Sequence, residues 1–209
     1  MWWIMNSSDR LMVTAMVGVA ANGIYAVAYK IPTLLSSVTQ VFNQAWSYSA
    51  IREEGSSDEE KYNNDIYNRL VVIVCICAAG LMMVMKFFLR YYVGAEYYIA
   101  WKYTPVLIIG FIFSTLGTFV ATAYTVHKDS MGYLVSGTAG AMVNIILNFA
   151  LIPQMGAMGA ALATAASYFI VFYYRIRDTK KVLKIIYLAK ASYICRDITS
   201  CSGNNYVYQ

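Results

Sequence analysis

The sequence predicts an all-α integral membrane protein with six membrane helices. Hydrophobic residues make up 59% of its 209 residues and charged residues only 13%. A soluble domain has roughly 45–50% apolar and about 25% charged residues. The apolar residues are spread over several segments of about 20 residues, the length that a helix needs to cross a bilayer. The protein is therefore expected to be polytopic rather than singly anchored.

Three helices are expected in the first half of the chain, at about residues 1–17, 22–51 and 68–90. The first is expected to be truncated, because its apolar stretch is interrupted by the polar residues 6–10 and is too short before them. A turn at residues 18–23 separates it from the second helix, in which Pro32 predicts a kink. Residues 52–69 are rich in Glu and Asp and are expected to form a hydrophilic loop.

Three further helices are expected at about residues 104–126, 131–152 and 157–175. Residues 90–103 are short and aromatic, which is typical of a connector at the level of the lipid headgroups. Residues 127–130 form a four-residue turn. Pro153 is expected to end the fifth helix, because proline lacks the backbone N–H that continues a helix. A tight link containing Gly156 then leads into the sixth helix.

These helices place one transmembrane domain in residues 1–181, followed by a polar tail at residues 182–209. The tail is rich in Ser, Asn and Tyr and has no helical period after about Tyr193. Two interpretations of it stay open, a flexible cytoplasmic tail and the out-of-frame end of a broken gene. Cys195 and Cys201 can pair there, but nothing in their spacing requires it.

The distribution of Lys and Arg predicts the orientation. Residues 52–69, 127–130 and 175–184 lie on one side of the membrane, because two spans separate each of these segments from the next. They contain most of the basic residues of the connecting segments, and the positive-inside rule therefore places them and the C-terminus in the cytoplasm. The net charge of +5 is explained by this bias, and no nucleic-acid partner is expected.

Three ionisable residues inside expected spans are candidates for function, since such groups are costly in a membrane. Asp9 and Arg10 are adjacent and project about 100° apart on a helix, so they need not pair with each other. They either line a water-filled cavity or mark a helix end at the interface. Lys30 lies about two turns into the second helix, where it either meets a phosphate or reaches the outer headgroups.

Amide side chains form two further candidate groups. Gln40, Asn43 and Gln44 are spaced i, i+3 and i+4, which predicts a polar patch on one helix face. Such amides bind hydroxyl-rich cargo or a neighbouring helix. Asn144 and Asn148 lie one helical turn apart in an apolar run and leave the same two alternatives open. For this pair a structural or gating role is favoured.

Prolines and small residues indicate close helix packing or gating rather than chemistry. Pro32 and Pro153 interrupt helical hydrogen bonding. Gly156 belongs to the tight link, and Gly159 helps to open the sixth helix with a nearly smooth surface. The sequence contains no phosphate-binding glycine loop, nucleophile elbow or metal-ligand cluster. We therefore expect no catalytic residue, no metal and no cofactor.

Three stretches, taken together in their order and spacing, resemble a known family. Residues 2–10 end in Asp9-Arg10, residues 18–32 contain Gly-Ile-Tyr-Ala-Val-Ala-Tyr-Lys-Ile-Pro, and residues 144–164 contain the Asn pair, Pro153 and the small-residue helix. Over about residues 1–181 the chain resembles the C-terminal half of polysaccharide or O-antigen flippases. These lipid-linked oligosaccharide flippases belong to the multidrug/oligosaccharidyl-lipid/polysaccharide exporter superfamily.

The resemblance implies the six-helix C-terminal lobe of a two-lobed transporter with a pseudo-twofold axis along the membrane normal. Family members move undecaprenyl-pyrophosphate-linked oligosaccharide across the bacterial cytoplasmic (inner) membrane for lipopolysaccharide and other surface polysaccharides. By this resemblance Arg10 and Lys30 would face the pyrophosphate, and Asp9 would couple transport to an ion or proton. The candidates for sugar hydroxyls are Asn43, Gln44 and Asn144.

The resemblance also implies partners. These are the lipid-linked oligosaccharide, membrane lipid and a missing N-terminal lobe, without which the isolated half is not expected to transport; a polysaccharide polymerase is a further candidate. One alternative function is a cation-coupled multidrug exporter of the same superfamily, although two cations and one acid argue against it. The other is a non-transporting membrane scaffold in a glycan-assembly complex.

Overall fold

The computed structural model describes residues 2–53 and 59–179, and this part of the chain is all-helical, as predicted. It consists of six α-helices and one 3₁₀ helix, with no β-strand among the described residues. In chain order the elements are α1 (Trp2–Met16), α2 (Val19–Glu53), α3 (Glu59–Tyr92), η1 (Ala95–Lys102), α4 (Thr104–Val126), α5 (Ser130–Met155) and α6 (Ala157–Thr179).

Four of the described helices are long and apolar enough to cross a membrane. They cover Lys61–Tyr92 in α3, Thr104–Val126, Ser130–Met155 and Ala157–Thr179. α1 has 15 residues and is shorter than a span, and α2 has the length but carries polar side chains through its middle. The described helices therefore fit a multi-pass membrane protein with at least these four apolar spans.

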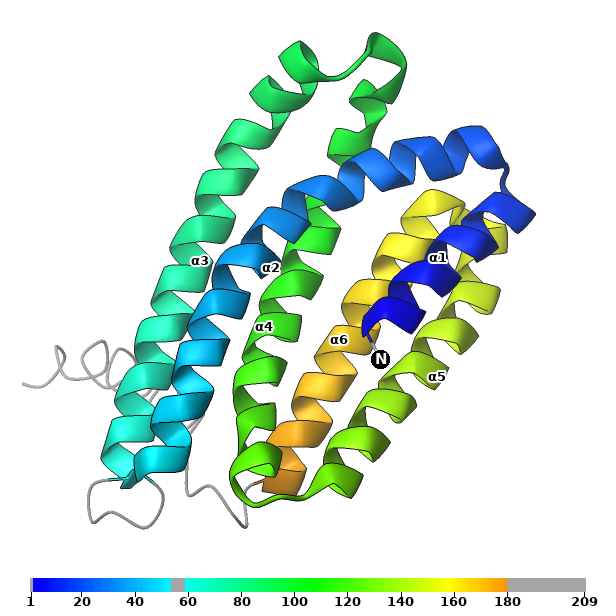
Figure 1. Ribbon diagram of the computed structural model, residues 1–209. Helices are drawn as coiled ribbons and strands as arrows, with labels where there is room; N and C mark the ends of the chain where they lie inside the picture. Colours follow the sequence, from blue (N-terminus) through cyan, green and yellow to red (C-terminus); the bar gives the residue numbers. More distant parts are fainter. Residues whose placement is uncertain (1, 54–58, 180–209) are drawn as a thin grey trace, which may run out of the picture.

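α6 lies between α4 and α5 and packs along both of them (Figure 1). α1 lies over α5, and α2 crosses from α1 to pack on α4, while α3 stands at the edge beside α2 and α4. The α1–α2 turn, η1 and the α5–α6 turn lie at one end of the molecule. The α4–α5 turn, the end of α2 and the end of α6 lie at the other.

α3 shows how the edge of the molecule is built for an apolar surrounding. One narrow stripe of α3 is buried against its neighbours, consisting of Leu70, Val74, Ala78, Met85 and Leu89. Its other faces expose large apolar side chains, among them Val72, Ile73, Ile76, Met83, Val84, Phe87 and Phe88. A helix that is apolar on its outer faces as well is typical of a membrane span.

The polar connections are shorter than expected from sequence. The predicted loop at residues 52–69 is wrong in extent, because α2 continues to Glu53 and α3 already begins at Glu59. Glu and Lys are good helix formers, so the charged segment from Glu59 onward forms the first turns of α3 and not a loop. Residues 54–58 lie outside the described residues, as do the predicted tail at 182–209 and its two cysteines.

The turn predicted at residues 18–23 is likewise shorter. Gly18 alone adopts a left-handed backbone, with φ of 121°, and α2 begins at Val19. Asn22 and Gly23 therefore belong to α2. At the other end of the molecule Asp129 caps α5, since its carboxylate accepts a hydrogen bond of 2.9 Å from the Gly132 N–H. Ser130 thus begins α5 and does not belong to the turn.

Pro153 does not end α5, contrary to the prediction. The helix continues to Met155 and ends at Gly156, whose φ is 59° and whose N–H donates to the Ile152 carbonyl over 2.8 Å. A proline this close to a helix end removes one hydrogen bond without preventing the last turn. α2 also continues through Pro32 as one helix, and its course bends along its length (Figure 1).

Candidate functional site

Asp9 is the centre of a buried polar cluster that joins four helices. Its side chain is fully buried in α1. Oδ1 accepts a hydrogen bond of 2.6 Å from Asn148 Nδ2 of α5. Oδ2 accepts one of 2.5 Å from Thr164 Oγ1 of α6 and one of 3.3 Å from the Tyr25 hydroxyl of α2. We call Asp9, Tyr25, Asn144, Asn148 and Thr164 the Asp9 cluster.

The two asparagines of α5 complete the Asp9 cluster. Both are fully buried, and Asn148 Nδ2 also donates to Asn144 Oδ1 over 3.3 Å. Two of their polar atoms, Asn144 Nδ2 and Asn148 Oδ1, have no hydrogen-bond partner among the described residues. Unpartnered buried polar atoms are uncommon in native structures, and these two leave one donor and one acceptor beside a carboxylate.

Small residues allow α5 and α6 to approach closely enough to form the cluster. Ala160, Ala161 and Ala163 are fully buried in the first turns of α6. A Cβ on Gly159 would collide with the carbonyl of Leu151, so only glycine fits at this point of the α5–α6 hairpin. Gly159 was predicted as a packing residue, and the close approach that it permits places Thr164 against Asp9.

Aromatic side chains close one side of the cluster. Tyr25 and Tyr29 lie with their ring centroids 5.8 Å apart, and Tyr29 contacts Phe111 edge-on at 5.3 Å. The hydroxyls of Tyr29 and Tyr168 are 3.5 Å apart. All four rings are at most 5% exposed, so a buried aromatic layer that spans α2, α4 and α6 continues from Tyr25 of the cluster.

The structure brings only some of the predicted site residues together. Asn144 lies with Asp9 and not with Lys30, which is exposed on α2. Arg10 is half-buried, and its Nε has no partner among the described residues. Asn43 is buried, whereas Gln44 is exposed on another face of α2. The predicted patch of Gln40, Asn43 and Gln44 is therefore divided between two faces.

One face of α2 instead carries a continuous polar stripe. Its members recur at intervals of three and four residues, which places them on one side of a helix; they are Lys30, Thr33, Ser37, Gln40 and Gln44. All of them are exposed except Thr33, which is half-buried. This α2 stripe runs through a helix whose neighbouring exposed positions, Leu34, Val38 and Val41, are apolar.

Arg175 is a second buried ionisable residue, and sequence reasoning missed it. It was interpreted as the start of a soluble segment, yet it lies inside α6 and is only 8% exposed. Its Nε donates to Ser136 Oγ over 3.1 Å and its Nη1 to the Gly117 carbonyl over 2.9 Å. The apolar period of α6 continues past this position to the buried Ile176, which was the available signal.

Tyr25 and Thr164 were also missed as members of a site. Thr164 is a hydroxyl residue within an alanine-rich run, and Tyr25 is one of the nineteen tyrosines of the chain. Neither pattern distinguishes a hydrogen-bond partner of Asp9 from a packing residue. The reason is that Thr164 lies 155 residues and Tyr25 lies 16 residues from Asp9 in the sequence.

The Asp9 cluster brings side-chain oxygen atoms of Asp9, Tyr25, Asn144, Asn148 and Thr164 together inside the described part of the chain. The described residues include no group of three or more His, Cys, Asp or Glu side chains that could hold a metal ion. Comparisons with family models, with curated proteins and with solved structures found no match to the chain. The comparisons therefore assign neither a family nor a function.

Proposed function

We propose that the chain is the C-terminal lobe of a cation-coupled flippase for lipid-linked oligosaccharide, in the bacterial cytoplasmic membrane and with its C-terminus in the cytoplasm. The observation that carries this proposal is the burial of Asp9 among hydrogen bonds from three other helices. An ionisable residue inside a membrane helix bundle is costly and is a functional candidate by default. The resemblance of residues 1–181 to such flippases supplies the cargo class.

The chemistry of the Asp9 cluster suits a small hard cation or a proton. The side chains that converge there bear oxygen atoms, which are the ligands that hard cations prefer. Asn148 Oδ1 has no partner, and it lies on the residue that already contacts Asp9. A cation bound to Asp9 would displace the N–H and O–H donors that now point at the carboxylate.

The position of the cluster explains how such binding would drive movement. Its hydrogen bonds join α1, α2, α5 and α6. Replacing those bonds by cation–oxygen contacts changes the relative stability of alternative helix packings, and a ligand shifts a conformational equilibrium by its differential affinity for the two states. We propose that this is the coupling step.

The α2 stripe is the proposed cargo side. Polar side chains exposed to hydrocarbon would be costly, so this stripe faces a polar cavity or another protein. Lys30 supplies positive charge for a pyrophosphate, and Gln40 and Gln44 supply amides for sugar hydroxyls. We propose that an N-terminal lobe lies opposite the stripe and completes the cavity.

The multidrug-exporter alternative ranks lower because the stripe carries a cation and no acid. A cavity for organic cations would need an exposed carboxylate, and Asp9 instead points into the helix bundle with its oxygens hydrogen-bonded. In the scaffold alternative the α2 stripe is a docking face for another protein. This alternative differs from the flippase because it predicts that the stripe binds no cargo.

The coupling site can be tested on the purified chain in detergent. We expect the unfolding temperature to be higher in Na⁺ than in a large organic cation, or to depend on pH. A ligand at 100 times its Kd stabilises the folded state by about 2.7 kcal/mol. Asp9→Asn should abolish the shift. Asp65→Asn, which changes an exposed carboxylate in α3, should keep it. A chain that responds to no ion and no pH change contradicts a coupling role.

The cargo side can be tested with a fluorescent polyprenyl-pyrophosphate oligosaccharide. We expect Lys30→Gln to weaken its binding at least about tenfold, since a charge-assisted hydrogen bond is worth about 1.5–3 kcal/mol. Lys61→Gln, on the exposed surface of α3, is the matched control and should bind as the unchanged chain does. Binding of organic cations in place of the glycolipid favours the exporter, and binding of neither favours the scaffold.

A further inference from the structure

Arg175 is a cation held inside the helix bundle, and no carboxylate forms an ion pair with it among the described residues. Its neighbours there are neutral, a hydroxyl of Ser136, the carbonyl of Gly117 and the ring of Tyr133. The nearest acid along α6, Asp178, accepts a hydrogen bond of 2.7 Å from the Tyr124 hydroxyl. Burying an unpaired charge is costly, and natural proteins usually pair it or neutralise it.

The helix packing around Arg175 fixes its direction. Gly117 lies close to the backbone of Phe172, and a Cβ on Gly140 would collide with Val171, so α6 approaches both α4 and α5 closely. The guanidinium lies over the ring of Tyr133, with Cζ 5.2 Å from the ring centroid. These contacts hold the guanidinium between α4 and α5 rather than letting it extend to the end of α6.

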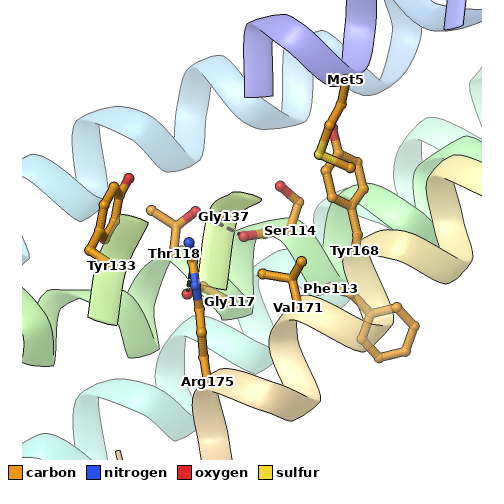
Figure 2. Close-up of a pocket in the computed structure, with 10 residues that line it drawn as sticks. All are labelled: Met5, Phe113, Ser114, Gly117, Thr118, Tyr133, Gly137, Tyr168, Val171 and Arg175. Carbon is orange, nitrogen blue, oxygen red and sulfur yellow. Dashed lines mark hydrogen bonds between the residues drawn. The ribbon is translucent and has the colours of Figure 1, made fainter. Parts of the chain in front are cut away.

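The guanidinium points into a pocket formed by α4, α5 and α6, with Met5 of α1 at its rim (Figure 2). The pocket has a volume of about 240 Å³. Ser114, Thr118 and Tyr133 also line the pocket and bear hydroxyl groups, and the Thr118 hydroxyl donates to the Ser114 carbonyl over 2.9 Å. The remaining wall is largely apolar and comprises Met5, Phe113, Tyr168 and Val171.

Several of the residues that line the pocket carry hydrogen-bond donors without a partner in the described part of the chain. A guanidinium has five N–H donors, and the bonds to Ser136 and Gly117 occupy one on Nε and one on Nη1. Among the described residues no acceptor takes the Nη2 donors. The hydroxyls of Ser114 and Tyr133 likewise make no hydrogen bond within the described part of the chain. An oxyanion is the kind of ligand that accepts hydrogen bonds from a guanidinium and from hydroxyl groups.

We propose that this pocket binds a phosphate group, with Arg175 as the charged donor and Ser114 and Tyr133 as hydroxyl donors. A planar guanidinium matches the geometry of phosphate oxygens. The pocket volume is about eight times the ~30 Å³ that a water molecule occupies in the liquid, which leaves room for a phosphate and the start of an attached chain. The apolar wall suits the chain attached to the phosphate of an anionic lipid. The polar groups would hold the phosphate of such a lipid or free phosphate.

This site is separate from the proposed coupling and cargo groups. The Asp9 cluster and the α2 stripe contribute none of the side chains that line it. Loss of phosphate binding would therefore leave the cation response of the chain unchanged, and loss of the cation response in Asp9→Asn would leave phosphate binding unchanged. The two proposals can fail independently.

The test compares three probes on the full chain in maltoside micelles by titration calorimetry. They are dioctanoyl phosphatidic acid, dioctanoylglycerol and inorganic phosphate. We expect saturable binding of phosphatidic acid, at least tenfold weaker binding to Arg175→Gln, and no binding of dioctanoylglycerol at this site. Arg177→Gln removes the same charge from an exposed position two residues away and should leave the affinity unchanged.

The inorganic phosphate arm distinguishes the two sources of the ligand. Affinity similar to that of phosphatidic acid assigns free phosphate, whereas much weaker affinity assigns the lipid. Equal binding of phosphatidic acid to Arg175→Gln and the unchanged chain, or equally tight binding of dioctanoylglycerol, overturns the proposal. If Arg175→Gln does not fold, Ser114→Ala and Tyr133→Phe decide instead, and unchanged affinity in both rejects the site.

Discussion

Two charged side chains are buried among the described residues, and they are satisfied in different ways. Asp9 accepts three hydrogen bonds from neutral donors, whereas Arg175 donates to one hydroxyl and one carbonyl and keeps donors directed at a pocket. Removing Asp9 leaves three donors without an acceptor, whereas removing Arg175 leaves one hydroxyl and one carbonyl without a donor. The two residues therefore differ in what their replacement should cost.

Replacing Asp9 by alanine should destabilise the protein. The change leaves donors on Asn148, Thr164 and Tyr25 without an acceptor, and each such loss costs about 1–3 kcal/mol. We expect a net loss of about 2–3 kcal/mol, because the cost of burying the carboxylate is removed at the same time. Thermal or denaturant unfolding in detergent measures it. Asp65→Ala should stay within about 0.5 kcal/mol, and equal stability of both variants would refute the importance of the cluster.

Asn148 should matter more to stability than an exposed asparagine. Asn148→Ala removes the donor that links Asp9 to Asn144, and a broken buried network costs about 1–3 kcal/mol. Asn68→Ala changes an exposed residue of α3 and should be nearly neutral. Unfolding midpoints of the two variants in the same detergent provide the comparison. If both midpoints match that of the unchanged chain, the Asp9 cluster is not a stabilising network.

Packing between helices depends on glycines placed where backbones approach. On α4, Gly110 faces Ala165 and Gly117 faces Phe172, at a spacing of seven residues. On α5, Gly140 faces Val171. In a membrane, close backbone contact through small residues replaces the hydrophobic effect as the main source of helix association. α6 is thereby held by two different helices along most of its length.

Gly110→Ala should therefore destabilise the α4–α6 contact. Its Cβ would lie 2.9 Å from Ala165 Cα, and overpacking of this kind costs about 1–3 kcal/mol. Gly80→Ala is the matched control, because nothing lies within 4 Å of the new Cβ in α3. There alanine should stabilise the helix by about 0.5–1 kcal/mol. A higher unfolding temperature for Gly110→Ala would contradict the packing.

The molecule has two distinct ends with different connections. The short α4–α5 turn contains His127 and Lys128 and lies at the end where α6 also finishes. The aromatic 3₁₀ helix η1 lies at the opposite end (Figure 1). At the η1 end, Lys86 of α3 lies over the ring of Trp101, 4.4 Å from its centroid. Basic and aromatic residues at this level suit a headgroup region. The proposed orientation assigns the η1 end to the outside of the membrane.

This orientation can be tested by cysteine labelling in intact cells. After replacement of the four native cysteines, a cysteine at Lys102 should react with a membrane-impermeant maleimide added outside. One at Lys128 should react only after the membrane is permeabilised, because the two positions lie at opposite ends of α4. The reverse pattern would invert the orientation, and labelling of both from outside would exclude it.

Much of the fold could be predicted because its signals are local. Apolar segments longer than about 20 residues predict spans wherever they occur, and four of the predicted spans agree with long apolar helices. Helix ends were less predictable. Pro153 was expected to stop α5, and residues 52–69 were expected to form a loop, because a single residue or a charged run signals an interruption without showing whether neighbouring turns tolerate it.

The candidate site could be predicted only in part. Asp9 and the Asn144–Asn148 pair were recognisable, since polar residues in apolar helices are rare and conspicuous. Their partners Tyr25 and Thr164 were not, because each belongs to a residue type that packs equally well without a polar contact. Arg175 was expected at the cytoplasmic end of the last span, since a single Arg near the end of a span has the same sequence pattern whether it reaches the headgroups or turns inward.

Composition and periodicity were enough to predict an all-helical, largely apolar protein and the polar residues within its helices. Both properties depend on composition and period, which are fixed by neighbours along the chain. The contacts of Asp9 with Asn148 and Thr164, and the turn of Arg175 into a pocket beside Gly117, depend instead on how the helices pack in three dimensions. Those pairings join positions far apart in sequence, and they depend on how closely small residues let α4, α5 and α6 approach.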